Sequence, residues 1–174
     1  MARAIMFSLL SAILLEAVAS KMSCPGSKAL MHAKTQVAVD FPTSTCSAVR
    51  SEVLARLGGA SGWRDPHNGG IYTLLSHSAH TVEAKRLTGD RKYTDLIEFT
   101  FTESGSGCHL DGCSESQGSS YLDFSTNYCN MYILYCGSAA GCPIVSRDFS
   151  FSSEEISRSS GAGMDKSKCL PNVA

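Results

Sequence analysis

The stretch YTDLIEFTFT, residues 93–102, is the clearest strand signal in the chain. Its bulky side chains recur at every second position, so Ile97, Phe99 and Phe101 share one face, while threonine and glutamate residues occupy the other. Asp95 falls on the apolar face near the beginning of the stretch, where an edge position would hydrate it. The alternation predicts a β-strand with one buried face.

Two further strands are predicted immediately upstream. Residues Thr81 to Leu87 form one candidate, and residues 88–91, Thr-Gly-Asp-Arg, supply the turn that separates it from the stretch above. These two strands should therefore form an antiparallel hairpin. Residues Ile71 to Leu75 are a third candidate strand.

A strand and a helix are predicted before these. Residues Gln36 to Phe41 alternate with period two, and Pro42 ends them. Ser44 or Thr45 could then cap a helix whose apolar positions, from Cys46 to Leu57, recur at helical spacing before Gly58-Gly59 stops it. The charged residues of this helix lie mostly off the apolar stripe and are expected to be solvated; they are Arg50, Glu52 and Arg56.

The last third of the chain is rich in glycine and serine and has weaker patterns. Residues 121–124, 130–135 and 148–151 are interpreted as short extended pieces, and residues 153–159 as a weak helix. Cys169 should tie the serine-rich tail back to the domain. Taken together, the patterns predict an α+β fold, mostly antiparallel sheet with one N-terminal amphipathic helix.

The N-terminus has the features of a secretory signal peptide. Arg3 precedes an apolar run that is too short to cross a bilayer, and Ala17 and Ala19 are the small residues that signal peptidase reads. We expect residues 1–19 to be the signal peptide and residues 20–174 to be a single secreted domain without a membrane anchor. An uncleaved anchor or a buried helix is the alternative.

The eight cysteines all follow the signal segment, and an even number in an exported chain predicts four disulfides. Five of them lie between positions 108 and 142, so full pairing requires at least one bridge to a cysteine outside that segment. Zinc is the rival explanation, but Cys-x2-Cys pairs are absent from the sequence. The cysteines are Cys24, Cys46, Cys108, Cys113, Cys129, Cys136, Cys142 and Cys169.

Composition excludes several classes of function. A net charge of −1 removes the electrostatic argument for binding nucleic acid or an anionic membrane, and a hydrophobic share of 43% is that of a folded protein. The sequence has no Gly-x-Ser-x-Gly elbow, no His-Glu-x-x-His motif and no phosphate-binding glycine loop. We therefore expect no cofactor and no metal.

The segment WRDPHNGG, residues 63–70, is the most pointed local motif. Its aspartate, proline, asparagine and glycines favour a tight turn. In a functional interpretation, Asp65 and His67 are an acid–base pair or a metal site, because a carboxylate can orient an imidazole that titrates near neutrality. Trp63 would then be a binding platform with Asn68 beside it. A turn without chemistry is the simpler interpretation.

Other histidines and tyrosines are weaker candidates. His109 follows Cys108, which suggests a nucleophile pair only if that thiol is free. His77 and His80 are three residues apart, but in a loop they are expected to be plain surface residues. Tyr128 and Asn130 have the chemistry of protein or carbohydrate recognition, although a half-buried strand packed on disulfides explains them too.

Several segments carry a resemblance to a known family, and it covers roughly residues 37–169. The segments are residues 65–68, 93–95, 99–100, 113–117, 123–130 and 134–136. In them the chain resembles an uncharacterised family of small secreted cysteine-rich proteins of unicellular algae, with no assigned function. The resemblance implies one secreted domain and no catalytic residue.

Three functions remain open at this point. The first is a secreted, disulfide-stabilised protein without catalytic activity that binds an extracellular protein or a glycan. The second is a small secreted hydrolase that uses Asp65 and His67, with His109 as a further candidate. The third is a secreted enzyme inhibitor, since loops held by disulfides lose little entropy on binding.

Overall fold

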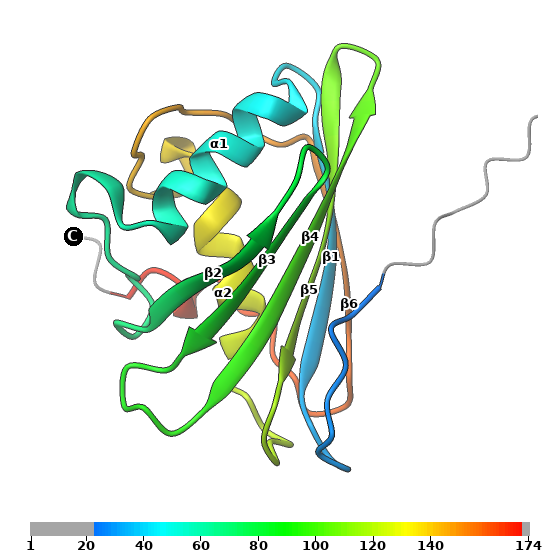
Figure 1. Ribbon diagram of the computed structural model, residues 1–174, viewed down its shortest axis with the longest axis vertical. Helices are drawn as coiled ribbons and strands as arrows, with labels where there is room; N and C mark the ends of the chain where they lie inside the picture. Colours follow the sequence, from blue (N-terminus) through cyan, green and yellow to red (C-terminus); the bar gives the residue numbers. More distant parts are fainter. Residues whose placement is uncertain (1–22, 172–174) are drawn as a thin grey trace, which may run out of the picture.

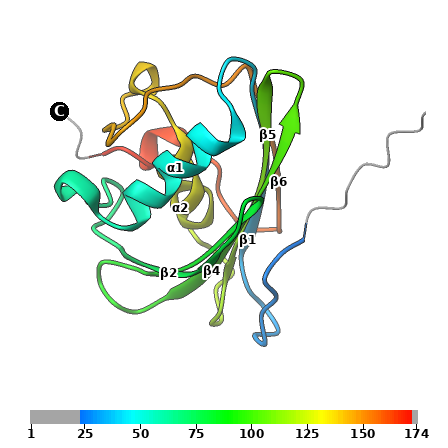
Figure 2. The same cartoon turned by 45° about the horizontal axis from the view of Figure 1, so that its top comes forward.

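A computed structural model describes residues 23–171, so the signal-peptide prediction lies outside the described residues. One antiparallel sheet of six strands carries two helices, α1 (Cys46–Leu57) and α2 (Thr126–Tyr135), on the same face (Figures 1 and 2). The fold is therefore α+β, as predicted. The predicted helix follows the first strand, so its description as N-terminal is wrong, and a second helix is present.

The sheet has the strand order β2-β3-β4-β5-β1-β6, so the first strand lies between two later ones. The predicted hairpin is confirmed, because β3 pairs antiparallel with β4 on either side of the turn at residues 88–91. The strand bounds are β1 Lys34–Phe41, β2 Ile71–His77, β3 Thr81–Leu87, β4 Thr94–Ser104, β5 Gly107–Ser116 and β6 Ser153–Arg158.

Helix α1 begins where the sequence indicates. The side chain of Thr45 accepts a hydrogen bond from the backbone N–H of Ala48, and Gly58 ends the helix. The expectation that its charges are solvated is wrong for two of them. Glu52 and Arg56 are fully buried, where they form an ion pair with an Nε–Oε1 distance of 2.9 Å.

Helix α2 replaces the extended piece expected at residues 130–135. It lies between the sheet, α1 and the C-terminal segment, and nine of its ten residues are buried. A helix that is covered on every side has no polar face, so its sequence lacks the contrast with period 3.6 that reveals a surface helix.

Two strands were not expected. The inward face of strand β5 begins with Cys108 and Leu110 but continues with Gly112, Ser114 and Ser116, so its apolar alternation is too short to reveal the strand. The weak helix predicted for residues 153–159 is wrong, because Ser153–Arg158 form the edge strand β6. Residues 121–124 and 148–151 are loop rather than extended strand.

The core lies between the sheet and the helices, and Ile97, Phe99 and Phe101 of β4 are fully buried in it as the alternation predicted. The expectation that Asp95 lies at a hydrated edge is wrong. Strand β4 lies inside the sheet, and the Asp95 side chain is buried.

All eight cysteines are paired, which confirms the four predicted disulfides. Three bridges join the 108–142 segment to cysteines outside it, and the fourth closes a short local loop. The pairs are Cys24–Cys113, Cys46–Cys108, Cys129–Cys169 and Cys136–Cys142.

Candidate functional site

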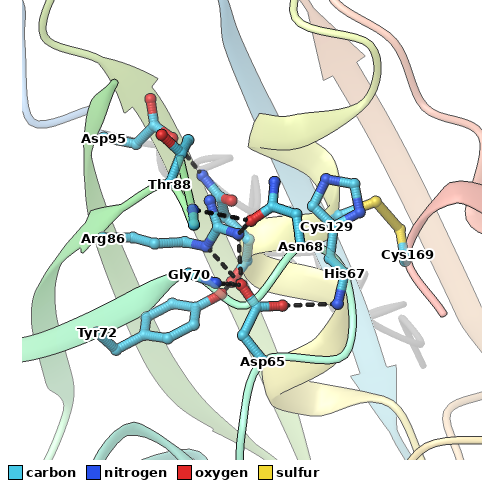
Figure 3. A network of polar contacts seen from close by, with 12 residues as sticks. Asp65, His67, Asn68, Gly70, Tyr72, Arg86, Thr88, Asp95, Cys129 and Cys169 are labelled. Carbon is cyan, nitrogen blue, oxygen red and sulfur yellow. Dashed lines mark hydrogen bonds and ion pairs between the residues drawn. A yellow bond between two sulfur atoms is a disulfide. The ribbon is translucent and has the colours of Figure 1, made fainter. Parts of the chain in front are cut away.

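The Asp65 carboxylate is the centre of the turn at residues 63–70 (Figure 3). Its Oδ1 accepts the backbone N–H of His67 at 2.7 Å, and its Oδ2 accepts that of Gly70 at 2.8 Å. The fully buried guanidinium of Arg86 in β3 donates to the same Oδ2 through Nε at 3.1 Å and through Nη2. Both carboxylate oxygens of Asp65 are therefore already hydrogen-bonded, and the contact with Arg86 attaches the turn to the sheet.

Glycine is required at one position of this turn. A Cβ atom on Gly70 would lie 2.4 Å from the guanidinium carbon of Arg86, so any side chain there would displace the Arg86–Asp65 pair. Asn68 is exposed, yet its Oδ1 accepts from Arg86 Nη2 as well.

His67 does not face Asp65. Its ring Nδ1 lies 2.5 Å from the carbonyl oxygen of Lys168, next to the Cys129–Cys169 disulfide (Figure 3). Burial lowers the pKa of His67, and the Lys168 carbonyl opposes this only in part. The imidazole thus joins the turn to the C-terminal segment.

We expect His67→Ala to lower the free energy of unfolding by no more than about 1 kcal/mol, because it removes one solvent-exposed hydrogen bond. Asp65→Ala should cost distinctly more, because it leaves Arg86 buried without its partner. Urea unfolding of both variants checks the order. A larger loss for His67→Ala than for Asp65→Ala would contradict the structural role assigned to Asp65.

His109 lies on the other face of the sheet. Its Nδ1 is 2.6 Å from Oδ1 of Asp40, and its Nε2 is 3.4 Å from Oδ1 of Asp111. Burial lowers the pKa of His109, but hydrogen bonding to Asp40 and the charge of Asp111 outweigh this, and the net shift is upward.

The structure does not bring the three hydrolase candidates together. Asp65 and His67 lie on the helix side of the sheet and His109 on the opposite side. Cys108 is in a disulfide and is no nucleophile. Within residues 23–171, no group of three or more His, Cys, Asp or Glu side chains is placed to hold a metal ion.

Two of the four predicted binding residues lie in the core. The Tyr128 hydroxyl donates to Oε1 of Glu154 at 3.0 Å. The Asn130 amide donates to Oδ2 of Asp95 at 2.8 Å, while its own Oδ1 is buried without a hydrogen-bond partner among the described residues. Trp63 is half-buried and lines a cavity of about 330 Å³.

A second cavity, of about 110 Å³, opens beside the β3–β4 turn, and we call it the acceptor pocket. Asp95 is the most deeply buried acid in its lining, and its carboxylate accepts hydrogen bonds from Oγ of Ser116 at 2.8 Å and from Asn130. Burial raises the pKa of Asp95, opposed in part by these two hydrogen bonds. Its lining is Thr88, Tyr93, Asp95, Ser116, Ser120, Leu122, Asp123, Phe124 and Thr126.

The rim of the acceptor pocket is apolar and exposed. Tyr93, Leu122 and Phe124 are 47%, 61% and 79% exposed, although large apolar side chains are normally covered. Phe124 has a φ of 51°, a left-handed conformation that is rare for a bulky residue. It is held there because Asp123 accepts the backbone N–H groups of Ser125 and Gly163.

The sequence pattern does not predict this pocket. It marks Asp95 only as an irregularity on an apolar face, and it predicts an extended piece at residues 121–124, where the structure has a loop. A carboxylate on the buried face of a strand was the one available signal.

No protein-family model matches the chain, and neither does any curated protein or any solved structure. The algal family suggested by the sequence thus stays a prediction. In the part of the chain that the structure describes, no helix is long and apolar enough to cross a membrane.

Proposed function

We propose that the protein is an extracellular binding protein that holds a basic side chain of a partner protein in the acceptor pocket. The observation that carries this proposal is a buried carboxylate, Asp95, beneath an exposed apolar rim. Four disulfides are consistent with an extracellular location.

The buried carboxylate of the pocket favours a cationic ligand. Asp95 accepts one side-chain hydrogen bond on each oxygen, which leaves capacity for more. A lysine ammonium or an arginine guanidinium supplies only hydrogen-bond donors. Its positive charge would also offset the cost of keeping the buried carboxylate ionised.

The size of the acceptor pocket and the apolar residues of its rim favour a protein ligand over a glycan. Pockets for small molecules measure about 300–1,000 Å³, and the acceptor pocket, at about 110 Å³, accommodates a side-chain head group more readily than a sugar ring. Exposed aromatic and aliphatic side chains around a small pocket are typical of a protein interface, where an anchor is surrounded by apolar contacts.

We expect blocked lysine or arginine (the N-acetyl, N′-methylamide forms) to bind with a dissociation constant in the millimolar range. This affinity corresponds to a binding free energy of roughly 4 kcal/mol for an isolated side chain. NMR titration should shift the amides around residues 88–95 and 116–126. Blocked norleucine, which lacks the charge, should not bind. Binding should weaken as the pH falls through the raised pKa of Asp95, since the protonated carboxyl no longer attracts a cation.

Two variants sharpen this test. Asp95→Asn should abolish binding, and Phe124→Ala should weaken it, while the matched control Asp111→Asn on the far face of the sheet should bind as the wild type does. Unchanged lysine binding by Asp95→Asn would refute the proposal. Saturable binding of a neutral oligosaccharide at the same amides, without binding of lysine or arginine, would favour a glycan instead.

A further inference from the structure

The cavity beside Trp63, separate from the acceptor pocket, is large enough for a small molecule. Its volume of about 330 Å³ falls in the range of roughly 300–1,000 Å³ that is usual for such ligands. It lies between the C-terminal end of α1, the turn at residues 63–70 and the beginning of β2, and we call it the donor cavity. None of its lining residues lines the acceptor pocket.

Arg56 gives the donor cavity a fixed cation. Its Nε donates to Glu52, and its Nη1 donates to the carbonyl oxygens of Ile133 and Cys136, both at 2.9 Å. The third nitrogen, Nη2, is buried and has no hydrogen-bond partner among the described residues. Arg56 is among the residues that line the cavity, so its unpaired nitrogen is a donor next to that space.

Trp63 supplies a second donor of the same kind. Its indole Nε1 is buried, and within residues 23–171 nothing accepts a hydrogen bond from it. Leaving a buried donor unpaired costs about 1–3 kcal/mol, and more when the group is charged. Arg56 and Trp63 thus each bring an unused donor to the lining of this cavity, which suits a ligand that accepts hydrogen bonds.

The remaining lining agrees with an anionic ligand. Arg64 is exposed and adds a positive charge at the wall. The carboxylate of Asp65, the one acid in the lining, is already satisfied by Arg86 and two backbone N–H groups. Among its side chains, the cavity therefore offers free donors and no free carboxylate.

Apolar groups make up the rest of the wall. Leu57, Ile71 and the rings of Trp63 and Tyr72 line the same space. An inorganic anion would leave these surfaces in contact with water, whereas a ligand with a hydrocarbon body would cover them.

We propose that the donor cavity binds a small carboxylic acid with an apolar body. The carboxylate lies against Arg56 Nη2 and Trp63 Nε1, and the body packs on Leu57 and Ile71. Arg56 is pre-organised for this task, because its two other nitrogens are fixed to Glu52 and to α2.

The chain itself provides the reporter, since Trp63 is its single tryptophan. Hexanoate added to the disulfide-bonded protein should change the emission of Trp63 in a saturable manner at millimolar concentrations or below. Hexanamide has the same body without the charge and should bind at least about tenfold more weakly, as the loss of a charge-assisted hydrogen bond implies. Inorganic phosphate, which lacks the body, should also bind more weakly than hexanoate.

Two variants and one control test the cavity without disturbing the buried Arg56. Trp63→Phe keeps an aromatic wall and removes the indole donor, so calorimetry should show hexanoate binding weakened several-fold. Arg64→Gln should weaken it to a smaller extent and reduce its dependence on salt. Lys85→Gln, an exposed charge change on β3 outside the cavity, should bind as the wild type does.

Equal affinity for hexanoate and hexanamide would overturn the proposal, because the cavity would then be merely apolar. Phosphate binding as tightly as hexanoate would overturn the assigned ligand class. Absence of saturable binding, or unchanged binding in Trp63→Phe, would refute the site as described.

Discussion

Replacing Glu52 with glutamine is expected to lower the free energy of unfolding at neutral pH by about 3 kcal/mol, because it breaks a buried ion pair. Glu52 is fully buried and accepts the Nε–H of Arg56. It also accepts three consecutive backbone N–H groups, those of residues 145–147, at 2.7–2.9 Å. One carboxylate thus fixes α1, Arg56 and the loop that follows Cys142.

The same contacts predict the response to acid. Burial opposes the charged form of Glu52, but the hydrogen bonds from the 145–147 backbone outweigh it and lower its pKa from 4.5 to about 2. Because the folded-state pKa is the lower one, this stabilisation is complete above pH 4.5 and is lost as the pH falls toward 2. The difference in pKa corresponds to on the order of 3 kcal/mol.

Urea unfolding between pH 7 and pH 2 measures both effects. The wild type should lose stability steeply below pH 4.5, and Glu52→Gln should show a flatter curve. Glu103→Gln, an exposed change in β4, is the matched control and should follow the wild type. If Glu52→Gln kept the steep acid branch, another carboxyl group would be responsible for it.

Removing the Cys46–Cys108 disulfide by double alanine substitution should cost roughly 4 kcal/mol in the chain-entropy model. This bridge joins residues 62 apart and ties the beginning of α1 to β5. The Cys136–Cys142 bridge joins residues only 6 apart, so its removal should cost roughly 2 kcal/mol.

Equilibrium unfolding of the two double-alanine variants gives the comparison. The larger loss is expected for Cys46–Cys108, because its long loop restricts the unfolded chain more. A larger loss for the Cys136–Cys142 variant would show that contacts in the folded state, and not the unfolded chain, determine the effect.

The sequence predicts a helix or strand well where one face of that element is buried and the other is exposed to solvent. That contrast is why β4 and α1 could be predicted with bounds within two residues of those observed. It fails for α2, which is buried all round, and for β5, whose inward face carries Ser114 and Ser116 as part of a polar network with Asn127 and Asn130. Local patterns contain no information about such partners.

In the candidate sites too, the sequence reveals local features but not contacts between distant parts of the chain. Asp65, Trp63 and Asn68 could be singled out because turn residues are recognisable locally, and Trp63 does line a cavity. The burial of Asp95 and of Arg56 depends on which strands and helices lie beside them. That information arises only from the three-dimensional arrangement, so the acceptor pocket and the donor cavity could not be predicted.

The strand order has a consequence for how the chain folds as it is synthesised. Strands β2 to β5 are neighbours both in sequence and in the sheet, so each can pair soon after it is made. Strand β1 is made first, but one of its edges stays open until β6, the last strand, is complete. An open strand edge is a template for aggregation. Strand β6 covers that edge of β1 and becomes the edge strand itself, with the charged side chains of Glu155 and Arg158 exposed. Charged side chains on an edge strand oppose pairing with another chain, so β6 protects this side of the sheet from aggregation.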